Sequence, residues 1–175
     1  QSVQLFSSRP LESLLRQGLP IYATPKSRSS IALFRVLCAR RFGLAPKLTS
    51  SYPAAAAHLL IGDAAFEYAQ RDRNTQHHID LSGWWFEEMG LPFVFARWVV
   101  SKSLPQNQRD VLTAWLDSCI EYAASPDGLD VLASPADEED DGVFRRTYFT
   151  NLRYRLTEVD LSGMDMFLRL LEGNR

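Results

Sequence analysis

A short segment rich in hydroxyl and basic side chains could hold a small anion. It runs from Thr24 to Ser30 and directly precedes a stretch whose apolar residues have helical spacing. The first N–H groups of a helix have no partner within the helix and lie at the positive end of its dipole, so they attract carboxylates and phosphates. Serine hydroxyls would add donors, and Lys26 would add positive charge. We predict substrate binding by Thr24, Ser27, Arg28, Ser29 and Ser30.

The same segment lacks the glycine-rich patterns that cradle nucleotide phosphates. Neither G-x-x-x-x-G-K nor G-x-G-x-x-G occurs in it. A small carboxylate ligand therefore fits it better than a nucleotide does. The alternative is that Ser27 or Ser29 only caps the helix that follows, because serine is common at that position.

A glycine followed by an aspartate forms a second candidate for substrate binding. Gly62 and Asp63 close the apolar run at residues 58–61. A glycine lets the backbone come close to a ligand, and the Asp63 carboxylate could orient a substrate hydroxyl. The alternative, which the local sequence favours, is that Asp63 caps the next helix.

The histidines and cysteines show no pattern of metal ligation or nucleophilic catalysis. Three histidines and two cysteines lack the paired spacing of zinc ligands, and no Ser-His-Asp or Cys-His arrangement can be assigned. We expect His77 and His78 to be an exposed pair without function, and His58 to be structural. We expect Cys38 and Cys119 to be buried thiols in a reducing compartment.

The elements that must position these residues alternate over the first hundred residues. Strands are expected at 3–5 (half-buried), 19–24, 46–50, 58–61 and 92–100, and helices at 9–15, 31–42, 54–57, 64–70 and 80–90. This alternation predicts a parallel or mixed sheet with helices on both faces. Ligands of such sheets bind at the carboxyl ends of strands, so we place the site after residues 24 and 61.

The second half of the chain is predicted to be helical. Apolar residues follow helical spacing at 111–120, 144–152 and 161–171, and Thr157 with Asp160 resembles a capping box. The acidic run at 137–141 is expected to be a solvated loop, because adjacent side chains do not converge on one ion.

Length and composition exclude several classes of protein. The 175 residues suit one ordinary domain or two small ones, and 46% hydrophobic with 23% charged residues is typical of a globular chain. A net charge of -2 argues against nucleic-acid binding by bulk electrostatics. No apolar run reaches the roughly 18 residues of a membrane span. Gln1 is not an initiator methionine, so we expect the natural protein to begin further upstream.

Several blocks closely resemble the chorismate dehydratase family of menaquinone biosynthesis by the futalosine route. The most specific are LLIGDAA at 59–65, DL at 80–81, Trp85 and GLPFVFA at 90–96. The residues TP at 24–25 and SRSSIAL at 27–33 look like that family's strand-to-helix loop. YF at 148–149, NL at 151–152, YRL at 154–156, Gly163 and Phe167 resemble its C-terminal helical signature. The resemblance covers nearly the whole chain.

The resemblance implies an α/β fold like that of the type 2 periplasmic binding proteins, with two lobes and a cleft. Residues 1–16 would form a crossover strand and hinge from a first lobe, 17–98 the second lobe, and 99–175 a hinge with helices that return to the first lobe. That first lobe would precede Gln1 and hold the catalytic groups. The implied reaction is loss of water from chorismate to give 3-(1-carboxyvinyloxy)benzoate, without a metal or organic cofactor.

Two other functions remain open at this point. The sister family, which makes 1,4-dihydroxy-6-naphthoate, has an Ile-His-Glu-Gly-like motif where this chain has Ile61-Gly62-Asp63-Ala64, and the missing histidine favours the dehydratase. The same fold could also serve as a solute-binding module for a small carboxylate. We expect a cytoplasmic protein with a small-molecule substrate and neither nucleic acid nor membrane as partner, and a homodimer is left open.

Overall fold

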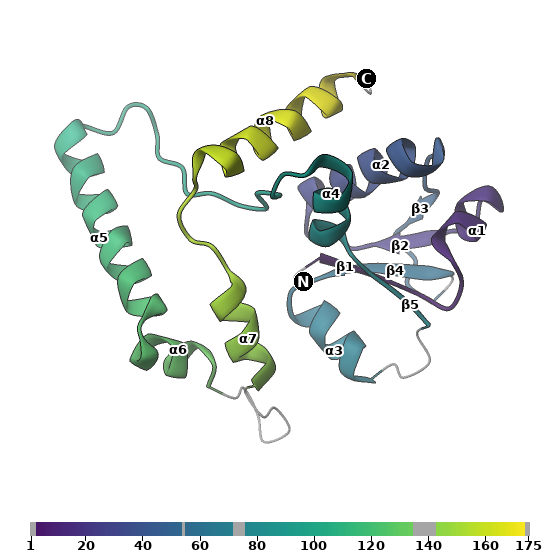
Figure 1. Ribbon diagram of the computed structural model, residues 1–175, viewed down its shortest axis with the longest axis horizontal. Coiled ribbons are helices and arrows are strands. Elements are labelled where there is room, and N and C mark those ends of the chain that lie inside the picture. Colours follow the sequence, from purple (N-terminus) through teal and green to yellow (C-terminus); the bar gives the residue numbers. More distant parts are fainter. Residues whose placement is uncertain (1–2, 54, 72–75, 135–142, 174–175) are drawn as a thin grey trace. The chain divides into compact units, whose positions relative to one another are not determined.

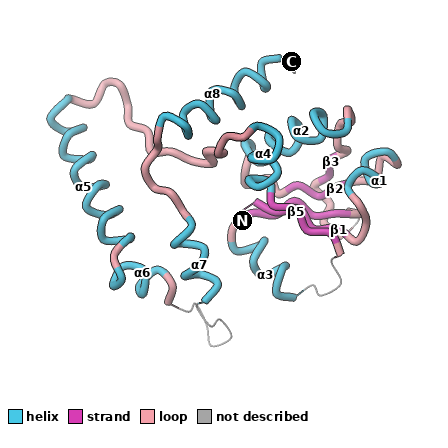
Figure 2. The backbone as a smooth tube through the Cα atoms, viewed as in Figure 1, coloured by secondary structure: helices cyan, strands magenta, loops and turns pink. Residues whose placement is uncertain are grey.

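The chain divides into two compact units, which we call the sheet unit and the helical unit. The computed structural model describes residues 3–53, 55–71, 76–134 and 143–173. The sheet unit comprises Gln1–Phe95 and Thr157–Arg175, and the helical unit comprises Ala96–Leu156. The chain therefore passes between the units twice (Figures 1 and 2).

The sheet unit is built on a five-stranded mixed sheet with the order β3-β2-β4-β1-β5. Its strands are β1 (Val3–Ser7), β2 (Ile21–Ala23), β3 (Leu48–Thr49), β4 (Ala57–Ile61) and β5 (His77–Asp80). Strand β2 runs parallel to β3 and β4, whereas β1 runs antiparallel to β4 and β5. The predicted α/β class with a parallel or mixed sheet is thus confirmed.

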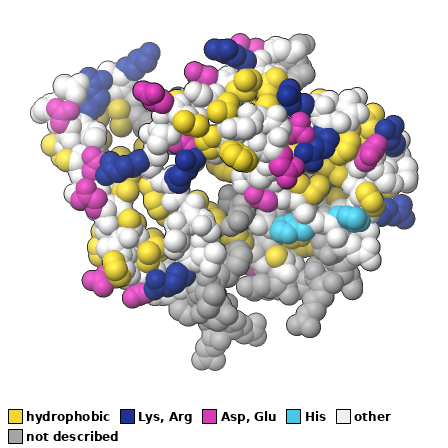
Figure 3. Space-filling model, in the orientation of Figure 1, with side chains coloured by type: hydrophobic (Ala, Val, Ile, Leu, Met, Phe, Trp, Pro, Cys, Tyr) yellow, Lys and Arg dark blue, Asp and Glu magenta, His cyan; other side chains and the backbone are white. Residues whose placement is uncertain are grey.

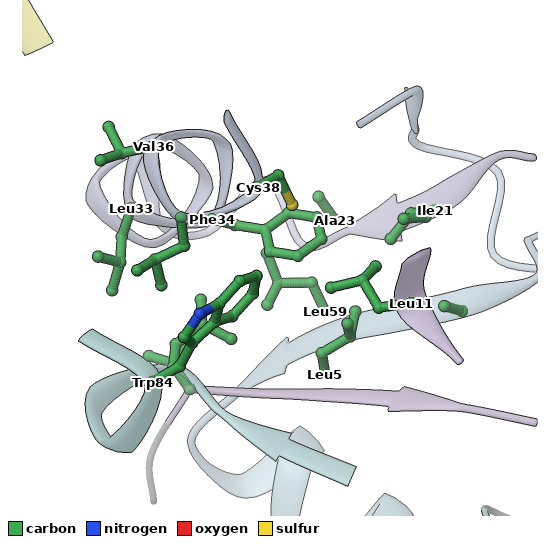
Figure 4. Packing of buried hydrophobic residues seen from close by; sticks show 14 of the residues in the cluster. Leu5, Leu11, Ile21, Ala23, Leu33, Phe34, Val36, Cys38, Leu59 and Trp84 are labelled. Atoms are coloured by element: carbon green, nitrogen blue, oxygen red, sulfur yellow. The ribbon is translucent and has the colours of Figure 1, made fainter. Parts of the chain in front are cut away.

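Helices cover both faces of this sheet. On one face, α1 (Leu11–Arg16), α2 (Arg28–Phe42), α4 (Leu81–Met89) and α8 (Glu158–Gly173) enclose the main core. Side chains of α2 and α4 meet strand residues such as Leu5 and Leu59 there (Figure 4). On the other face, α3 (Asp63–Arg71) places Ala65 against Phe6 and Leu60.

Local capping residues fix the ends of the two helices nearest the candidate site. Ser27 caps α2, and Gly43 ends it with a left-handed φ of 65°. Asp80 caps α4, and Gly90 ends that helix in the same way. The ends of both helices at these glycines agree with the sequence expectation. Helix α2 begins at Arg28, three residues before the expected start at residue 31, because its cap lies ahead of the first apolar residue.

Two expected strands and one expected helix differ from the structure in type or burial. All five residues of β1 are buried, so it is not half-buried: it lies between β4 and β5 with both faces covered. Residues 55–57 are not helical, because Ala57 already pairs in β4. Residues 92–100, expected to be a strand, pair with no strand in the described parts of the chain. Strand β5 was not expected, and it forms by pairing with β1.

The helical unit contains α5 (Gln106–Ala124), α6 (Pro126–Leu132) and α7 (Val143–Asn151). Ion pairs link these helices to each other and to the segment after α7: Arg155 with Asp117, and Arg146 with Asp130. The apolar stripe of α5 keeps its helical spacing but is not core, since no residue of α5 is buried. The acidic run at 137–141 lies outside the described residues.

The last helix returns to the sheet unit. The predicted capping box is present, with the Thr157 N–H donating to Asp160 Oδ2 at 2.8 Å and the Asp160 N–H facing Thr157 Oγ1 at 3.4 Å. Phe167 is buried, whereas Leu161 and Leu168 from the same expected stripe are exposed by 42% and 49%. Hydrophobic side chains accordingly show among charged ones on the surface over α8 (Figure 3).

Across the stretches that the structure describes, no helix is long and apolar enough to cross a membrane.

Candidate functional site

The candidate residues lie at one edge of the sheet because four strands point the same way. Strands β2, β3 and β4 are mutually parallel, and β5 shares their direction since β1 is antiparallel to both β4 and β5. The carboxyl ends of these four strands therefore meet at one edge, where α2, α3 and α4 begin. Ligands of open α/β sheets commonly bind at such an edge.

The two predicted loops leave neighbouring strands. Ala23 at the end of β2 stands opposite Leu59 of β4, and the Thr24 N–H donates to the Leu59 carbonyl at 3.2 Å. Strand β4 continues to Ile61 before Gly62 turns the chain. The register thus brings the loop after β2 beside the loop after β4.

The Ser27 side chain acts as the cap of α2, as the alternative interpretation of this segment proposed. Ser27 Oγ accepts the Ser30 N–H at 3.2 Å and lies 2.8 Å from Ser30 Oγ and 3.3 Å from Ser29 Oγ. These two hydroxyl contacts can use at most two of the three hydroxyl protons. At least one O–H is therefore left to donate to something else.

Further donors surround these hydroxyls. The N–H groups of Arg28 and Ser29 occupy the first turn of α2, where a helix offers no internal acceptor. That turn contains no acidic residue, and Lys26 and Arg28 are exposed beside it. Thr24 is 7% exposed, and its hydroxyl oxygen faces the Lys26 N–H at 3.5 Å, the outer limit for a hydrogen bond. This surplus of donors suits an anionic ligand.

The loop after β4 offers an acceptor instead. Gly62 has a φ of 56°, and its carbonyl accepts N–H groups of Ala65 and Phe66 at 2.9 and 3.2 Å. Asp63 is the first residue of α3 and is exposed. No hydrogen bond or ion pair of its carboxylate is found in the described part of the chain. Asp63 thus does not cap α3 as the local sequence favours, and its carboxylate stays available to a ligand.

Asp80, at the end of β5, belongs to the same edge and was overlooked as a candidate. Its Oδ2 accepts the Ser82 hydroxyl at 2.6 Å and the Gly83 N–H at 2.9 Å. Partial burial acts to raise the pKa of the Asp80 carboxyl, whereas the hydrogen bonds from Ser82 and Gly83 act to lower it. Recognising β5 in the sequence would have placed Asp80 at this edge.

An acidic residue distinguishes two of the three helix starts at this edge. Helix α4 starts at the Asp80 carboxylate and α3 starts with Asp63, whereas the first turn of α2 has no acid. A carboxylate at a helix start already interacts with the positive end of the helix dipole, and its negative charge repels a second anion. An anionic ligand is therefore best accommodated at α2.

The three histidines lie away from this edge, and of the pair expected to be exposed, His78 is exposed whereas His77 is half-buried. Although exposed, His78 in β5 stacks on Phe6 with ring centroids 5.0 Å apart, and its Nε2 lies 2.6 Å from Gln4 Oε1. Strand pairing that local sequence does not reveal supplies both partners. His58 Nε2 faces the Tyr52 carbonyl at 3.2 Å, a structural contact.

The two cysteines differ in burial. Cys38 lies in the main core, where burial raises the pKa of its thiol to about 12. Cys119 is exposed, which corrects the expectation of two buried thiols, because α5 buries none of its residues. Over residues 3–53, 55–71, 76–134 and 143–173, no three His, Cys, Asp or Glu side chains come together as metal ligands.

Comparison with known proteins adds to this geometry. A family profile described as menaquinone biosynthesis matches residues 1–173. The chorismate dehydratase of Thermus thermophilus is 30% identical over an alignment 198 positions long, which covers 97% of this chain and 68% of the Thermus protein. A match over almost the whole chain, together with the identity to this relative, shows that the chain belongs to the menaquinone biosynthesis family.

Proposed function

We propose that this protein is a chorismate dehydratase, a lyase that removes water from chorismate to give 3-(1-carboxyvinyloxy)benzoate. One observation supports it above all: a donor-rich helix start and an unpaired carboxylate follow neighbouring strands. Chorismate has two carboxylates and a ring hydroxyl. A carboxylate can accept hydrogen bonds from the helix start, and the hydroxyl can donate one to the Asp63 carboxylate. The relative named chorismate dehydratase supports the same proposal.

In this proposal the two loops divide the polar groups of the substrate between them. A carboxylate accepts from the α2 start, through Ser29 and the first-turn N–H groups, while the Ser30 hydroxyl, which is only 2% exposed, supports Ser27 Oγ at 2.8 Å. The ring hydroxyl donates to Asp63. Loss of the hydroxyl and a ring proton makes the ring aromatic, so the driving force lies in the substrate. The protein's main task is then to position the ring and exclude competing geometries.

We further propose that the sheet unit forms one lobe of a two-lobed fold like that of the type 2 periplasmic binding proteins. In this architecture β1 and α8 belong to the same lobe as the rest of the sheet unit, and the helical unit would lead back to the first lobe. Catalytic groups from the first lobe would face the edge that carries Thr24 and Gly62. The proposed setting is the cytoplasm.

The sister activity, synthesis of 1,4-dihydroxy-6-naphthoate, is the second candidate. Membership of the family supports it as well as the dehydratase. The residue after β4 favours the dehydratase, because Gly62 stands where the sister family's motif has a histidine. Gly62 has no side chain with which to move a proton.

Incubation of the full-length protein with chorismate, followed by mass spectrometry, tests the proposal. We expect a product lighter than chorismate by one water, with the ultraviolet absorbance of a substituted benzoate. Binding of chorismate without turnover would indicate a solute-binding module. Failure to bind chorismate, with turnover of the sister enzyme's substrate, would assign the chain to the sister activity.

Replacing Ser29 and Ser30 together with alanine should weaken chorismate binding by roughly tenfold. The change removes two hydroxyls but keeps the Ser27 cap, so the stability loss should stay near 1 kcal/mol. Isothermal titration and chemical denaturation measure the two quantities. Ser118 and Ser162 are exposed helical serines elsewhere, and their double alanine variant is the matched control. Equal affinities in all three proteins would refute carboxylate binding at α2.

The Asp63→Asn variant should bind chorismate about 10-fold to 100-fold more weakly, because a hydrogen bond to a charged group contributes roughly 1.5–3 kcal/mol. A chorismate analogue without the ring hydroxyl serves as control and should bind both proteins equally. If the variant weakens both ligands alike, Asp63 does not receive the hydroxyl. If the wild-type protein binds neither chorismate nor the analogue, the proposed substrate is wrong, and the experiment then does not test the role of Asp63.

A further inference from the structure

No further inference is drawn: the strongest candidate, the exposed uncharged face of α5 that carries Val111, Trp115 and Tyr122, carries no proposal because nothing in the structure shows what covers it.

Discussion

Replacing Gly163 with alanine is expected to lower the free energy of unfolding of the sheet unit by about 2 kcal/mol. A Cβ at this position would overlap the Pro92 carbonyl oxygen and lie 3.3 Å from the Pro92 carbonyl carbon. Both atoms belong to the backbone, so the segment or the helix must move. The gain of about 1 kcal/mol in helix propensity from Gly to Ala does not offset this.

The contact between α8 and Pro92 matters because it anchors the core beside it. Phe93 follows Pro92 and contacts Phe167 of α8 at 4.9 Å and Trp85 of α4 at 5.4 Å between ring centroids. A shift of α8 by even part of an ångström would loosen these edge-to-face contacts. The overlap at Gly163 therefore affects three elements rather than one side chain.

Gly173 provides the matched control for this prediction. It lies at the end of the same helix, and a Cβ there would meet no atom within 4 Å. Gly173→Ala should be neutral or slightly stabilising. Urea denaturation of the two variants separates overlap from helix propensity. Equal stabilities would mean that α8 does not approach Pro92 as closely as described.

Sequence reasoning succeeded where one residue decides a local structure. Ser27 caps α2, and Gly43 and Gly90 end α2 and α4, because capping hydrogen bonds and a positive φ involve only nearby residues. The capping box of Thr157 and Asp160 formed for the same reason. Such signals are readable without knowing any partner in space.

Sequence reasoning failed where the partner is distant in sequence. Residues 92–100 have strand composition, but they pair with none of the five strands that the structure describes, so their backbone stays outside the sheet. Strand β5 contains two histidines and an aspartate, yet pairing with β1 makes it a strand. The apolar spacing of α5 predicted a helix correctly, but periodicity does not show what a face contacts.

The candidate site was predictable in part for the same reasons. Thr24 and Gly62 follow apolar runs that do form strands, and parallel pairing of β2 with β4 brings their loops to one edge. Asp80 cannot be placed at this edge from the sequence alone, because the sequence of β5 does not indicate a strand. The free carboxylate of Asp63 could not be foreseen either, since aspartate at a helix start usually suggests a cap, whereas here Asp63 is already the first residue of α3.

The Gly62→Val variant is expected to lose at least 100-fold in chorismate turnover while the protein stays folded. At a φ of 56° a β-branched residue is strained, and a Cβ would meet no atom within 4 Å, so there is space but the backbone conformation is unfavourable. Relief of this strain, about 1–3 kcal/mol, would turn the loop and move both the Gly62 carbonyl and Asp63. Misplacement of a binding group by about 1 Å can cost roughly 100-fold in rate.

Two glycines with the same backbone conformation separate strain from a role in the site. Gly18 and Gly43 have φ values of 61° and 65°, a Cβ at either would meet no atom within 4 Å, and neither lies at the carboxyl ends of the parallel strands. Gly18→Val and Gly43→Val should therefore lose similar stability yet keep their turnover. If all three variants lose turnover together, strain alone explains the effect; if Gly62→Val keeps it, the loop after β4 does not contact the substrate.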